Sequence, residues 1–318
     1  MRLLAAPDKF RGTLTARGAS AAIAAGAARA GWEAQELPLA DGGEGTLDVL
    51  GGGNRRTTVT GPLGEPVEAA WRLEDDGTAV IEAALACGLS LAGGPEGNDP
   101  LRATSRGVGE LVAAAVDEGA RRVVVAVGGV ASTDGGVGAL EVLPSPLPVP
   151  LDVAVDVDAR FLDAADVFAP QKGATPGQVR ILRTRLARLG VPDVAGSGAA
   201  GGLAGGLAAV GARLLPGFDL VASRLGLDDR LAEADLVVTG EGRVDATSFT
   251  GKVVGRVLER AAAGGVDALV VAGEVAANSG IDAFSLVERY GPERAFAEPE
   301  ACLAELVETA LATRRNRA

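Results

Sequence analysis

Residues 2–30 read RLLAAPDKFRGTLTARGASAAIAAGAARA, and this stretch indicates the fold class. It opens with a short apolar run at 2–6, continues through a polar loop at 7–13 and ends in an alanine-rich stretch at 14–30. A strand, a loop and a helix in this order form the repeating unit of a parallel α/β sheet. Ligands of such sheets bind at the carboxyl ends of the strands, so the loop is the first candidate site.

The same alternation of apolar runs and helical stretches returns near the other end of the chain. We expect further strands at 36–40, 236–239 and 269–272, and helices at 252–263, 281–290 and 300–313. The middle of the chain has a different pattern, because Val59–Leu73 and Thr78–Glu82 flank the turn sequence Asp75-Asp76-Gly77. This arrangement predicts antiparallel pairing, followed by a helix near 107–118 and a strand at 123–127.

These patterns predict an α/β protein with two domains. A doubly wound parallel sheet is expected from residues 1–57 and 190–318, so that both ends of the chain form one domain. Residues 58–189 are expected to form an inserted mixed α/β domain. The proline-rich stretch Pro144–Pro150 lies inside the inserted domain.

The composition excludes several classes of function. The 318 residues are 47% hydrophobic and 23% charged, which are globular values. With no histidine in the chain, acid–base chemistry must use Asp, Glu or Lys. A net charge of −12 argues against nucleic acid and anionic membranes as partners. No apolar run reaches the length of a membrane helix, and the first residues do not form a signal peptide, so we expect a cytoplasmic protein.

Lysine is rare in this chain. Of the 30 basic residues only Lys9, Lys172 and Lys252 are lysines, and each lies near glycine in a short polar motif. A compact ammonium group that points at a phosphate is a reason to keep lysine at these positions. We expect loop lysines that bury little surface, and chance survival on loops is the alternative.

Four glycine-rich loops follow predicted strands or precede predicted helices. They are Asp8–Thr13, Asp41–Thr46, Gly128–Gly136 and Thr239–Asp245. Their glycines allow backbone N–H groups to approach an anion, and their acids are candidates for Mg²⁺ or for substrate hydroxyl groups. The alternative is a set of tight turns with capping side chains, in which Asp41 caps a helix.

A further glycine-rich segment, residues 196–201, matches the dinucleotide pattern G-x-G-x-x-G. That pattern requires a preceding strand, whereas residues 191–195 contain a proline. A glycine-rich entrance to a helix, facing a nucleotide or the joint between domains, is the expected structure instead. The chain also lacks the GxxxxGK[ST] pattern of the common phosphate-binding loop.

Taken together, the loops resemble the bacterial glycerate kinase family. The matching segments follow the family's order along almost the whole chain: residues 6–12, 38–46, 128–136, 170–174, 196–202 and 239–245. The resemblance implies a flavodoxin-like domain with a second domain that resembles restriction enzymes, and phosphorylation of D-glycerate with ATP and Mg²⁺. Compared with the family, several dozen residues are missing between Leu143 and Leu151, so the chain is a shortened member.

The resemblance and the loops together predict a set of site residues. The catalytic candidates are Asp8, Lys9, Arg11, Asp134, Glu241 and Asp245, with Asp134 and Asp245 as metal ligands. The substrate-binding candidates are Asp41, Gly42, Gly43, Glu44 and Thr46, and the candidates for nucleotide phosphates are Lys172, Gly198, Gly201 and Lys252. The alternative function is that of an impaired paralogue that binds a small organic acid or a nucleotide without turnover. A homo-oligomer is an option that the sequence leaves open.

Overall fold

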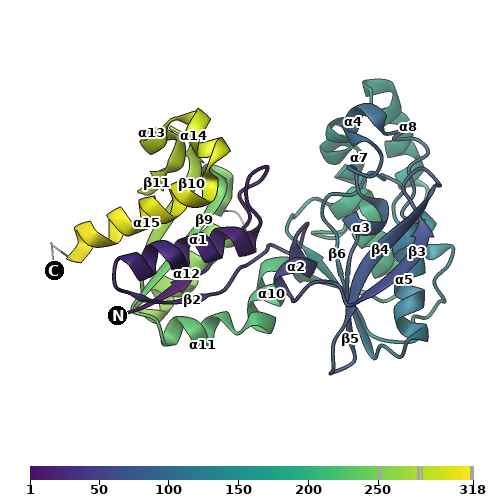
Figure 1. The fold of residues 1–318 in the computed structure, drawn as a ribbon. Coiled ribbons are helices and arrows are strands. Elements are labelled where there is room, and N and C mark those ends of the chain that lie inside the picture. The colour runs from purple at the N-terminus through teal and green to yellow at the C-terminus, as the bar shows by residue number, and fades with distance from the viewer. Residues whose placement is uncertain (250–251, 278–279, 281, 316–318) are drawn as a thin grey trace. The chain divides into compact units, whose positions relative to one another are not determined.

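The computed structural model describes residues 1–249, 252–277, 280 and 282–315, which form two compact units (Figure 1). Unit 1 comprises Met1–Asp41 and Phe218–Ala318, and unit 2 comprises Gly42–Gly217. The boundaries predicted from the sequence, after residues 57 and 189, differ from these divisions. The reason is that β8 (Arg213–Pro216) pairs with β7 (Leu151–Val155), which makes residues up to 217 part of the sheet of unit 2.

Unit 1 is built on a five-stranded parallel sheet with the strand order β11-β10-β9-β1-β2. In Figure 1 the purple strands from the start of the chain lie beside green and yellow elements from its end. The strands are β1 (Arg2–Ala5), β2 (Glu33–Glu36), β9 (Leu236–Val244), β10 (Asp267–Val275) and β11 (Ala283–Ser285). Both ends of the chain therefore form one sheet, as predicted.

Helices cover both faces of this sheet. On one face Ile23 of α1 and Leu303 of α15 pack onto β1, and on the other face Leu231 and Val257 pack onto Leu4 and its neighbours. The helices are α1 (Ala16–Arg29), α10 (Gly217–Leu225), α11 (Leu227–Ala232), α12 (Val253–Gly264), α13 (Leu286–Tyr290), α14 (Pro292–Ala297) and α15 (Pro299–Arg315), with a 3₁₀ turn η4 (Ala246–Phe249). This is the doubly wound arrangement that the sequence predicts.

The first helix shows how sequence sets a local boundary and a close contact. The Thr15 side chain accepts a hydrogen bond of 3.0 Å from the Gly18 amide, which caps the amino end of α1. A Cβ atom at Gly26 would lie 2.3 Å from the Ala304 carbonyl oxygen. Glycine at position 26 therefore permits α1 and α15 to pack backbone to backbone.

Two predicted elements of unit 1 lie elsewhere in the structure. The strand expected at 36–40 is β2 at Glu33–Glu36, and beyond it the Leu37 amide donates to the Ala5 carbonyl and the Leu39 amide donates to the Pro7 carbonyl. The ladder ends because Pro7, which accepts from Leu39, has no N–H to donate back to this segment. The helix expected at 281–290 is instead β11 followed by α13, and Ile281 lies outside the described residues.

Unit 2 contains a six-stranded mixed sheet with the order β3-β4-β5-β6-β7-β8. The strands not yet bounded are β3 (Arg55–Thr60), β4 (Pro66–Leu73), β5 (Thr78–Glu82) and β6 (Arg122–Ala126). The antiparallel hairpin across residues 75–77 is confirmed, with Arg72 opposite Val80. The run 59–73 is not one strand, however, because a turn closed by the Gly61 amide and the Glu65 carbonyl divides it into β3 and β4.

The helices of unit 2 pack around this sheet, and its core contains the fully buried Trp71, whose Nε1 donates to Thr57 Oγ1 at 2.9 Å. The helices are α2 (Thr46–Val49), α3 (Ala84–Cys87), α4 (Gly94–Gly97), α5 (Arg106–Asp117), α6 (Val137–Leu140), α7 (Ala164–Phe168), α8 (Pro176–Ala187) and α9 (Leu203–Ala209), with 3₁₀ turns η1 (Phe161–Asp163), η2 (Pro170–Lys172) and η3 (Ala199–Gly202). The proline-rich stretch 144–150 connects α6 directly to β7. The predicted α/β fold class with two domains is confirmed.

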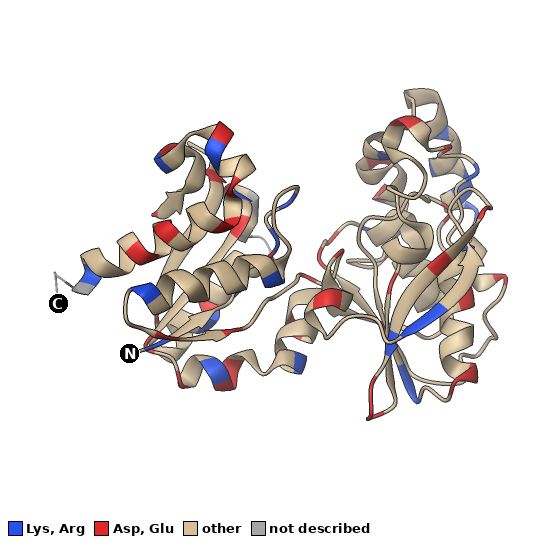
Figure 2. Ribbon diagram, in the orientation of Figure 1, with Lys and Arg blue, Asp and Glu red and all other residues tan. Residues whose placement is uncertain are grey.

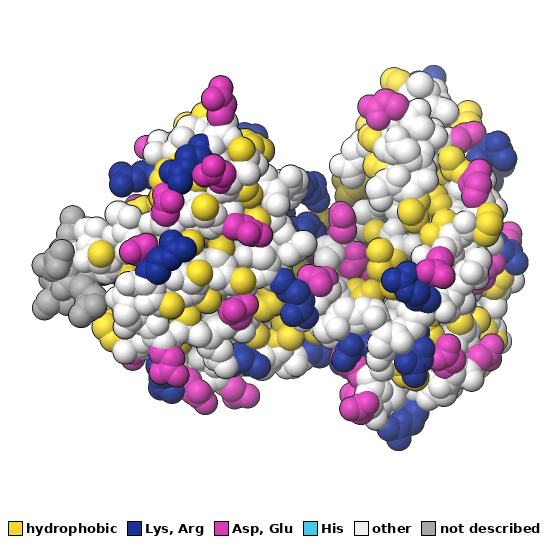
Figure 3. All heavy atoms as spheres, in the orientation of Figure 1, with side chains coloured by type: hydrophobic (Ala, Val, Ile, Leu, Met, Phe, Trp, Pro, Cys, Tyr) yellow, Lys and Arg dark blue, Asp and Glu magenta, His cyan; other side chains and the backbone are white. Residues whose placement is uncertain are grey.

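Charged side chains of both signs are distributed over the surface. Figure 2 shows acidic and basic residues interspersed along the helices of each unit. On the face drawn in Figure 3, lysine and arginine side chains alternate with aspartate and glutamate side chains. Within the part of the chain that the structure describes, no helix combines the length and the apolar character that a membrane crossing requires.

Candidate active site

Three acidic residues gather at the carboxyl edge of the unit 1 sheet. The strands β9, β1 and β2 are neighbours in the sheet, and Glu241, Asp8 and Asp41 lie at or just beyond their carboxyl ends. The Asp8 amide donates a hydrogen bond of 2.9 Å to the Gly240 carbonyl, which joins the first loop to the end of β9. Residues more than 230 positions apart in the sequence are thereby brought together.

The electrostatics of this edge are unusual for carboxyl groups. Asp8 is buried, and its pKa is raised from 3.8 to about 7, with this burial as the largest cause. The charges of Asp41 and Glu241 contribute to this rise, whereas Lys9 lowers the pKa of Asp8 through its charge and through a 2.7 Å hydrogen bond from its amide. Asp8 can therefore both hold and release a proton near neutral pH, which is the property that a general base requires.

Glu241 is the second perturbed carboxyl group of this edge. Partial burial raises its pKa, and the charges of Asp245 and Asp41 act in the same direction, whereas Ser248 and Lys252 lower it. Glu241 Oε1 is buried without a hydrogen-bond partner in the described part of the chain. A buried acceptor that lacks a donor is costly, so this oxygen is suited to a cation or to a donor from a ligand.

The predicted cations of unit 1 lie around these acids. Lys9 directly follows Asp8, and Lys252 is the N-cap residue of α12, near enough to Glu241 to lower its pKa. Arg11 is exposed at the end of the same loop as Lys9. The structure therefore brings seven of the predicted site residues into one region of unit 1: Asp8, Lys9, Arg11, Asp41, Glu241, Asp245 and Lys252.

The remaining predicted residues belong to unit 2, where the loop 42–46 is held by a residue that the motifs do not include. Glu82, at the end of β5, accepts hydrogen bonds of 3.0 Å from the amides of Gly45 and Leu47. A Cβ atom at Gly42 would lie 2.5 Å from the Gly217 Cα. Glu82 is a buried charged residue at the end of an apolar strand. An acidic residue directly after an apolar run is the sequence signal that could have identified it.

The predicted substrate residues Gly43, Glu44 and Thr46 lie in this loop. A Cβ atom at Gly128 would lie 2.7 Å from the Gly43 Cα and 3.0 Å from the Glu44 amide nitrogen, so the loop packs against the end of β6. Thr46 is buried, and its hydroxyl has no hydrogen-bond partner in the described structure. The 42–46 loop and the 128–136 loop thus form one packed region within unit 2.

The Asp134 carboxylate accepts four hydrogen bonds. Its Oδ2 accepts from the Ser105 amide at 2.9 Å, the Ser105 hydroxyl at 2.8 Å and the Gly138 amide at 3.2 Å, and its Oδ1 accepts from the Gly136 amide at 3.1 Å. A carboxylate has about four lone-pair sites, and four donors fill them. This geometry favours a structural role in the loop over the predicted metal role.

Lys172 differs from the exposed loop lysine that the sequence suggests. Its side chain is buried, and Nζ donates a hydrogen bond of 2.6 Å to the Ser132 carbonyl. The expectation of little burial is wrong because the turn η2 folds the lysine under the 128–136 loop. Burial lowers its pKa to about 8, against the opposing charges of Cys87 and Asp134.

The glycine-rich segment 196–202 lies beside Lys172. A Cβ atom at Gly201 would lie 2.9 Å from Lys172 Nζ, and one at Gly198 would lie 2.2 Å from the Arg160 carbonyl oxygen. The segment contains Ala200 with φ +54°, a left-handed conformation that is rare for alanine. Residues 191–195 form no strand, as expected, so the segment lacks the context of a dinucleotide fingerprint.

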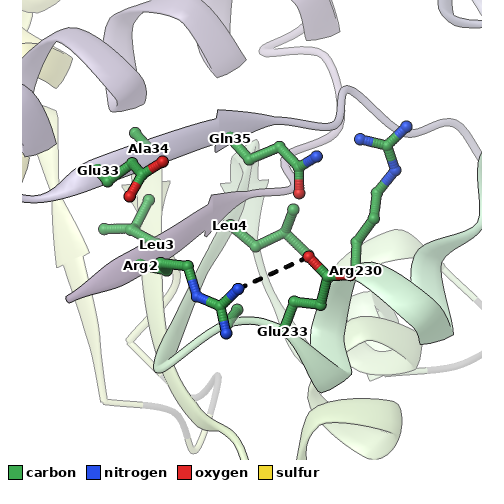
Figure 4. Close-up of a pocket in the computed structure, with 9 residues that line it drawn as sticks. Arg2, Leu3, Leu4, Glu33, Ala34, Gln35, Arg230 and Glu233 are labelled. Carbon is green, nitrogen blue, oxygen red and sulfur yellow. Dashed lines mark ion pairs between the residues drawn. The ribbon is translucent and has the colours of Figure 1, made fainter.

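A hollow of about 300 Å³ lies at the opposite edge of the unit 1 sheet (Figure 4). It is bordered by residues from the starts of β1 and β2 and from the end of α11, and the Arg2–Glu233 ion pair of 3.7 Å closes one side. Because ligands of parallel sheets bind at the carboxyl edge, this amino-edge hollow is not the candidate active site.

The described residues contain no group of three or more histidine, cysteine or acidic side chains that could hold a metal by themselves. Mg²⁺ in kinases is bound by one or two carboxylates together with the phosphates of the substrate. A pair such as Glu241 and Asp245, with the unpartnered Glu241 Oε1, is therefore a donor set that fits Mg²⁺ carried by a nucleotide.

Comparisons with known proteins identify the family. The sequence model of the Glycerate kinase family matches residues 3–147 and 144–314, two segments that meet at the proline-rich stretch. The chain is 43% identical over 302 residues to an uncharacterised protein of Mycobacterium tuberculosis, with 86% of this chain and 79% of the relative covered. It is 36% identical over 305 residues to the glycerate 2-kinase of Escherichia coli K12, with 80% of each chain covered.

A protein named glycerate kinase from Bacillus subtilis is 36% identical over an alignment of 346 residues that covers 90% of each chain. Because this alignment is longer than the 318 residues of the chain, it contains gaps in the chain, which agrees with a shortened member. A crystal structure from Salmonella typhimurium LT2, assigned as glycerate kinase 2, superposes with a TM-score of 0.84 at 32% identity and covers 100% of this chain and 99% of the other. The chain therefore belongs to the glycerate kinase family and is a kinase.

Proposed function

We propose that this kinase transfers the γ-phosphoryl group of ATP to a hydroxyl group of D-glycerate. The observation that carries the proposal is the carboxyl group of Asp8, which lies at the carboxyl edge of the sheet and has a pKa raised to about 7. Within a family of glycerate kinases, the reaction needs a group that accepts the hydroxyl proton as the phosphoryl group is transferred.

The groups around Asp8 supply the other requirements of phosphoryl transfer. That reaction asks the protein mainly for positioning and for neutralisation of charge. Lys9 and Arg11 follow Asp8 on the same loop and provide positive charge for the carboxylate of glycerate or for the transferred phosphoryl group. Asp41, beyond the neighbouring strand end, is assigned to a hydroxyl group of the substrate.

Glu241 and Asp245 would hold Mg²⁺ in this proposal, in place of the predicted pair that included Asp134. Mg²⁺ bound there would neutralise negative charge on the phosphates. Lys252 lies close enough to Glu241 to add a positive charge to the same region. A cation beside Glu241 would also lower the pKa of Asp8, so that Asp8 would be ready to accept a proton once the nucleotide is bound.

The cluster around Lys172 is assigned to an anionic group of a ligand. Lys172 uses one of its three N–H donors for the Ser132 carbonyl, and the Ser132 and Thr133 hydroxyls are buried without a partner in the described residues. Gly201 lies directly beside the ammonium group. Unsatisfied buried donors next to a glycine-rich segment support the predicted phosphate role of Lys172, Gly198 and Gly201.

The test is a coupled assay of ADP release with ATP and Mg²⁺ over D-glycerate, L-glycerate, glycolate, lactate and tartronate. D-glycerate is expected to give the highest kcat/KM, and Asp8→Asn is expected to reduce kcat by roughly 10²- to 10⁴-fold. Asp75→Asn is the matched control, because Asp75 is exposed in the turn between β4 and β5. Binding of glycerate without ADP release from the wild type would instead support the alternative of an impaired paralogue.

A further inference from the structure

A separate cavity of about 250 Å³ lies in unit 1, next to the acidic cluster of Asp8, Asp41 and Glu241. Its floor is formed where β9 and β10 run side by side, with Arg243 and Glu274 as partners in the register. Its walls come from the loop after β1 and from α13 and α14, which pack against each other beside β10 (Figure 1). All the residues that line it belong to the described part of unit 1.

One part of this cavity is apolar. Phe10 and Leu286 are 1% exposed and form fixed walls, whereas the Phe296 ring on α14 is 65% exposed. An aromatic ring at the border of a cavity offers a flat face to a planar ligand. A nucleobase can stack on such a ring.

The other part of the cavity is charged. The guanidinium groups of Arg11 and Arg243 line it, and neither makes a hydrogen bond or an ion pair within the described residues. By contrast, Arg256 and Arg260 of the same unit both bind Asp219. Two arginines without partners, in a chain with a net charge of −12, are available for an anion.

The cavity also contains one acceptor for hydroxyl groups. Glu274 lines it opposite Arg243 in the register, and the two side chains form no ion pair. A carboxylate in this position can accept hydrogen bonds from a ribose, as acidic residues do in other nucleotide sites. An apolar slot with an aromatic rim, an acceptor and two cations thus matches the three chemical parts of a nucleotide.

The geometry points to this cavity as the site of the base and ribose of the nucleotide, with Arg11 and Arg243 on its phosphates. This inference rests on the proposed use of ATP and adds a location that the glycine-rich motifs do not predict. The volume of about 250 Å³ lies a little below the ~300–1,000 Å³ of sites for whole drug-sized ligands, so the cavity suits the base and ribose rather than the whole nucleotide. Glycerate is too small and polar to use the apolar wall.

The chain connects this cavity to the acidic cluster. Phe10 and Arg11 follow Asp8 by two and three positions, and Gly242 directly follows Glu241. A Cβ atom at Gly242 would lie 2.8 Å from the Arg11 amide nitrogen, so the two loops are in contact at the cavity. A base bound in the cavity therefore leaves its phosphates beside the carboxyl groups assigned to Mg²⁺ and to proton transfer.

The experiment measures equilibrium binding of ADP and of tripolyphosphate by calorimetry, without glycerate, to the full chain. Arg243→Gln is expected to weaken both ligands about tenfold, because it removes a charge from the phosphates. Phe296→Ala is expected to weaken ADP about five- to tenfold and to leave tripolyphosphate unchanged, and Phe296→Trp is expected to retain ADP binding. Arg102→Gln is the matched control, since Arg102 is exposed and unpaired in unit 2.

Both substituted side chains are exposed, so the variants are expected to fold. Unchanged ADP affinity in Arg243→Gln and Phe296→Ala would overturn the inference, as would an equal loss of both ligands in Phe296→Ala. The outcome is separable from the proposed function. If ADP binding depends on Arg243 and Phe296 but the protein does not turn over glycerate, the nucleotide site is supported and the proposed glycerate kinase activity is refuted. If the protein turns over glycerate but ADP binding does not depend on these residues, the activity is supported and the nucleotide site is refuted.

Discussion

Replacing Asp8 with asparagine is expected to stabilise unit 1 at alkaline pH while it removes activity. In the folded state the pKa of Asp8 is raised to about 7 by burial and by its acidic neighbours, against an ordinary value of 3.8. The folded protein therefore holds this proton more tightly than the unfolded chain does. Below pH 3.8 both states are protonated and Asp8 costs no stability.

The magnitude follows from the difference between the two pKa values. As the pH rises from 3.8 to about 7, the unfolded chain loses the proton while the folded state keeps it, and stability falls by ~1.4 kcal/mol per pH unit. Above pH 7 the penalty levels off at roughly 4 kcal/mol. Asparagine carries no charge and its Oδ1 can still accept the Lys9 amide, so Asp8→Asn removes most of this penalty.

The assay is urea unfolding at pH 4.5 and at pH 8, followed by the fluorescence of Trp32. Trp32 lies in unit 1 and Trp71 in unit 2, so a Trp71→Phe background isolates unit 1. The gain from Asp8→Asn is expected to be about 1 kcal/mol at pH 4.5 and about 4 kcal/mol at pH 8. Asp75→Asn in the same background is the control and should give no such difference. A gain that does not depend on pH, or a loss of stability at pH 8, would refute the reasoning.

Four further predictions concern the pH dependence of the activity and the groups Asp134, Glu241 and Lys172. The kcat/KM for D-glycerate is expected to fall about tenfold per pH unit below pH 7, because Asp8 must be deprotonated, and a flat pH–rate profile between pH 5 and 7 would contradict this. Asp134→Asn is expected to cost about 1–3 kcal/mol of unfolding free energy, because an amide cannot accept all four hydrogen bonds, and to leave the Mg²⁺ dependence of the rate unchanged. Glu241→Gln is expected to raise the Mg²⁺ concentration needed for half-maximal rate and to have a small effect on the unfolding free energy. Burial lowers the pKa of Lys172 to about 8, so the free-energy penalty for burying its charge is present below pH 8 and is lost as the pH rises toward the ordinary pKa of 10.5. Lys172→Met is therefore expected to be less destabilising at pH 7 than at pH 10 in urea titrations. A larger loss of stability at pH 7 would show that the hydrogen bond to Ser132 dominates.

The fold could be predicted because its signals are local. The strand, loop and helix of residues 2–30 each have a distinct composition, and the Asp75-Asp76-Gly77 turn specifies its hairpin without help from distant residues. The elements that were misplaced are those whose ends depend on neighbours. β2 ends at Glu36 because Pro7, in the extension of β1, has no N–H to donate to it, and that pairing is not visible in the sequence of residues 36–40.

The candidate site could be predicted in part, for the same physical reason. Glycine next to an acid at the end of a strand is a local signal, and it finds Asp8, Asp41 and Glu241. What each carboxyl group does depends on its burial and on its donors, which the sequence does not contain. Asp8 and Asp134 look alike as loop acids, yet one has a raised pKa and the other accepts four hydrogen bonds.

The acidic cluster exists only when both ends of the chain have folded together. β1 has β2 on one side and β9 on the other, and the register of Leu3 with Leu236 brings the loop after β1 to the carbonyl of Gly240. The charges that raise the pKa of Asp8 come from Asp41, beyond β2, and from Glu241, on β9. The property that suits Asp8 to accept a proton near neutral pH is therefore produced by the strand order β9-β1-β2. Any change that detaches β9 from β1 is therefore expected to lower the pKa of Asp8, because it removes the charge of Glu241.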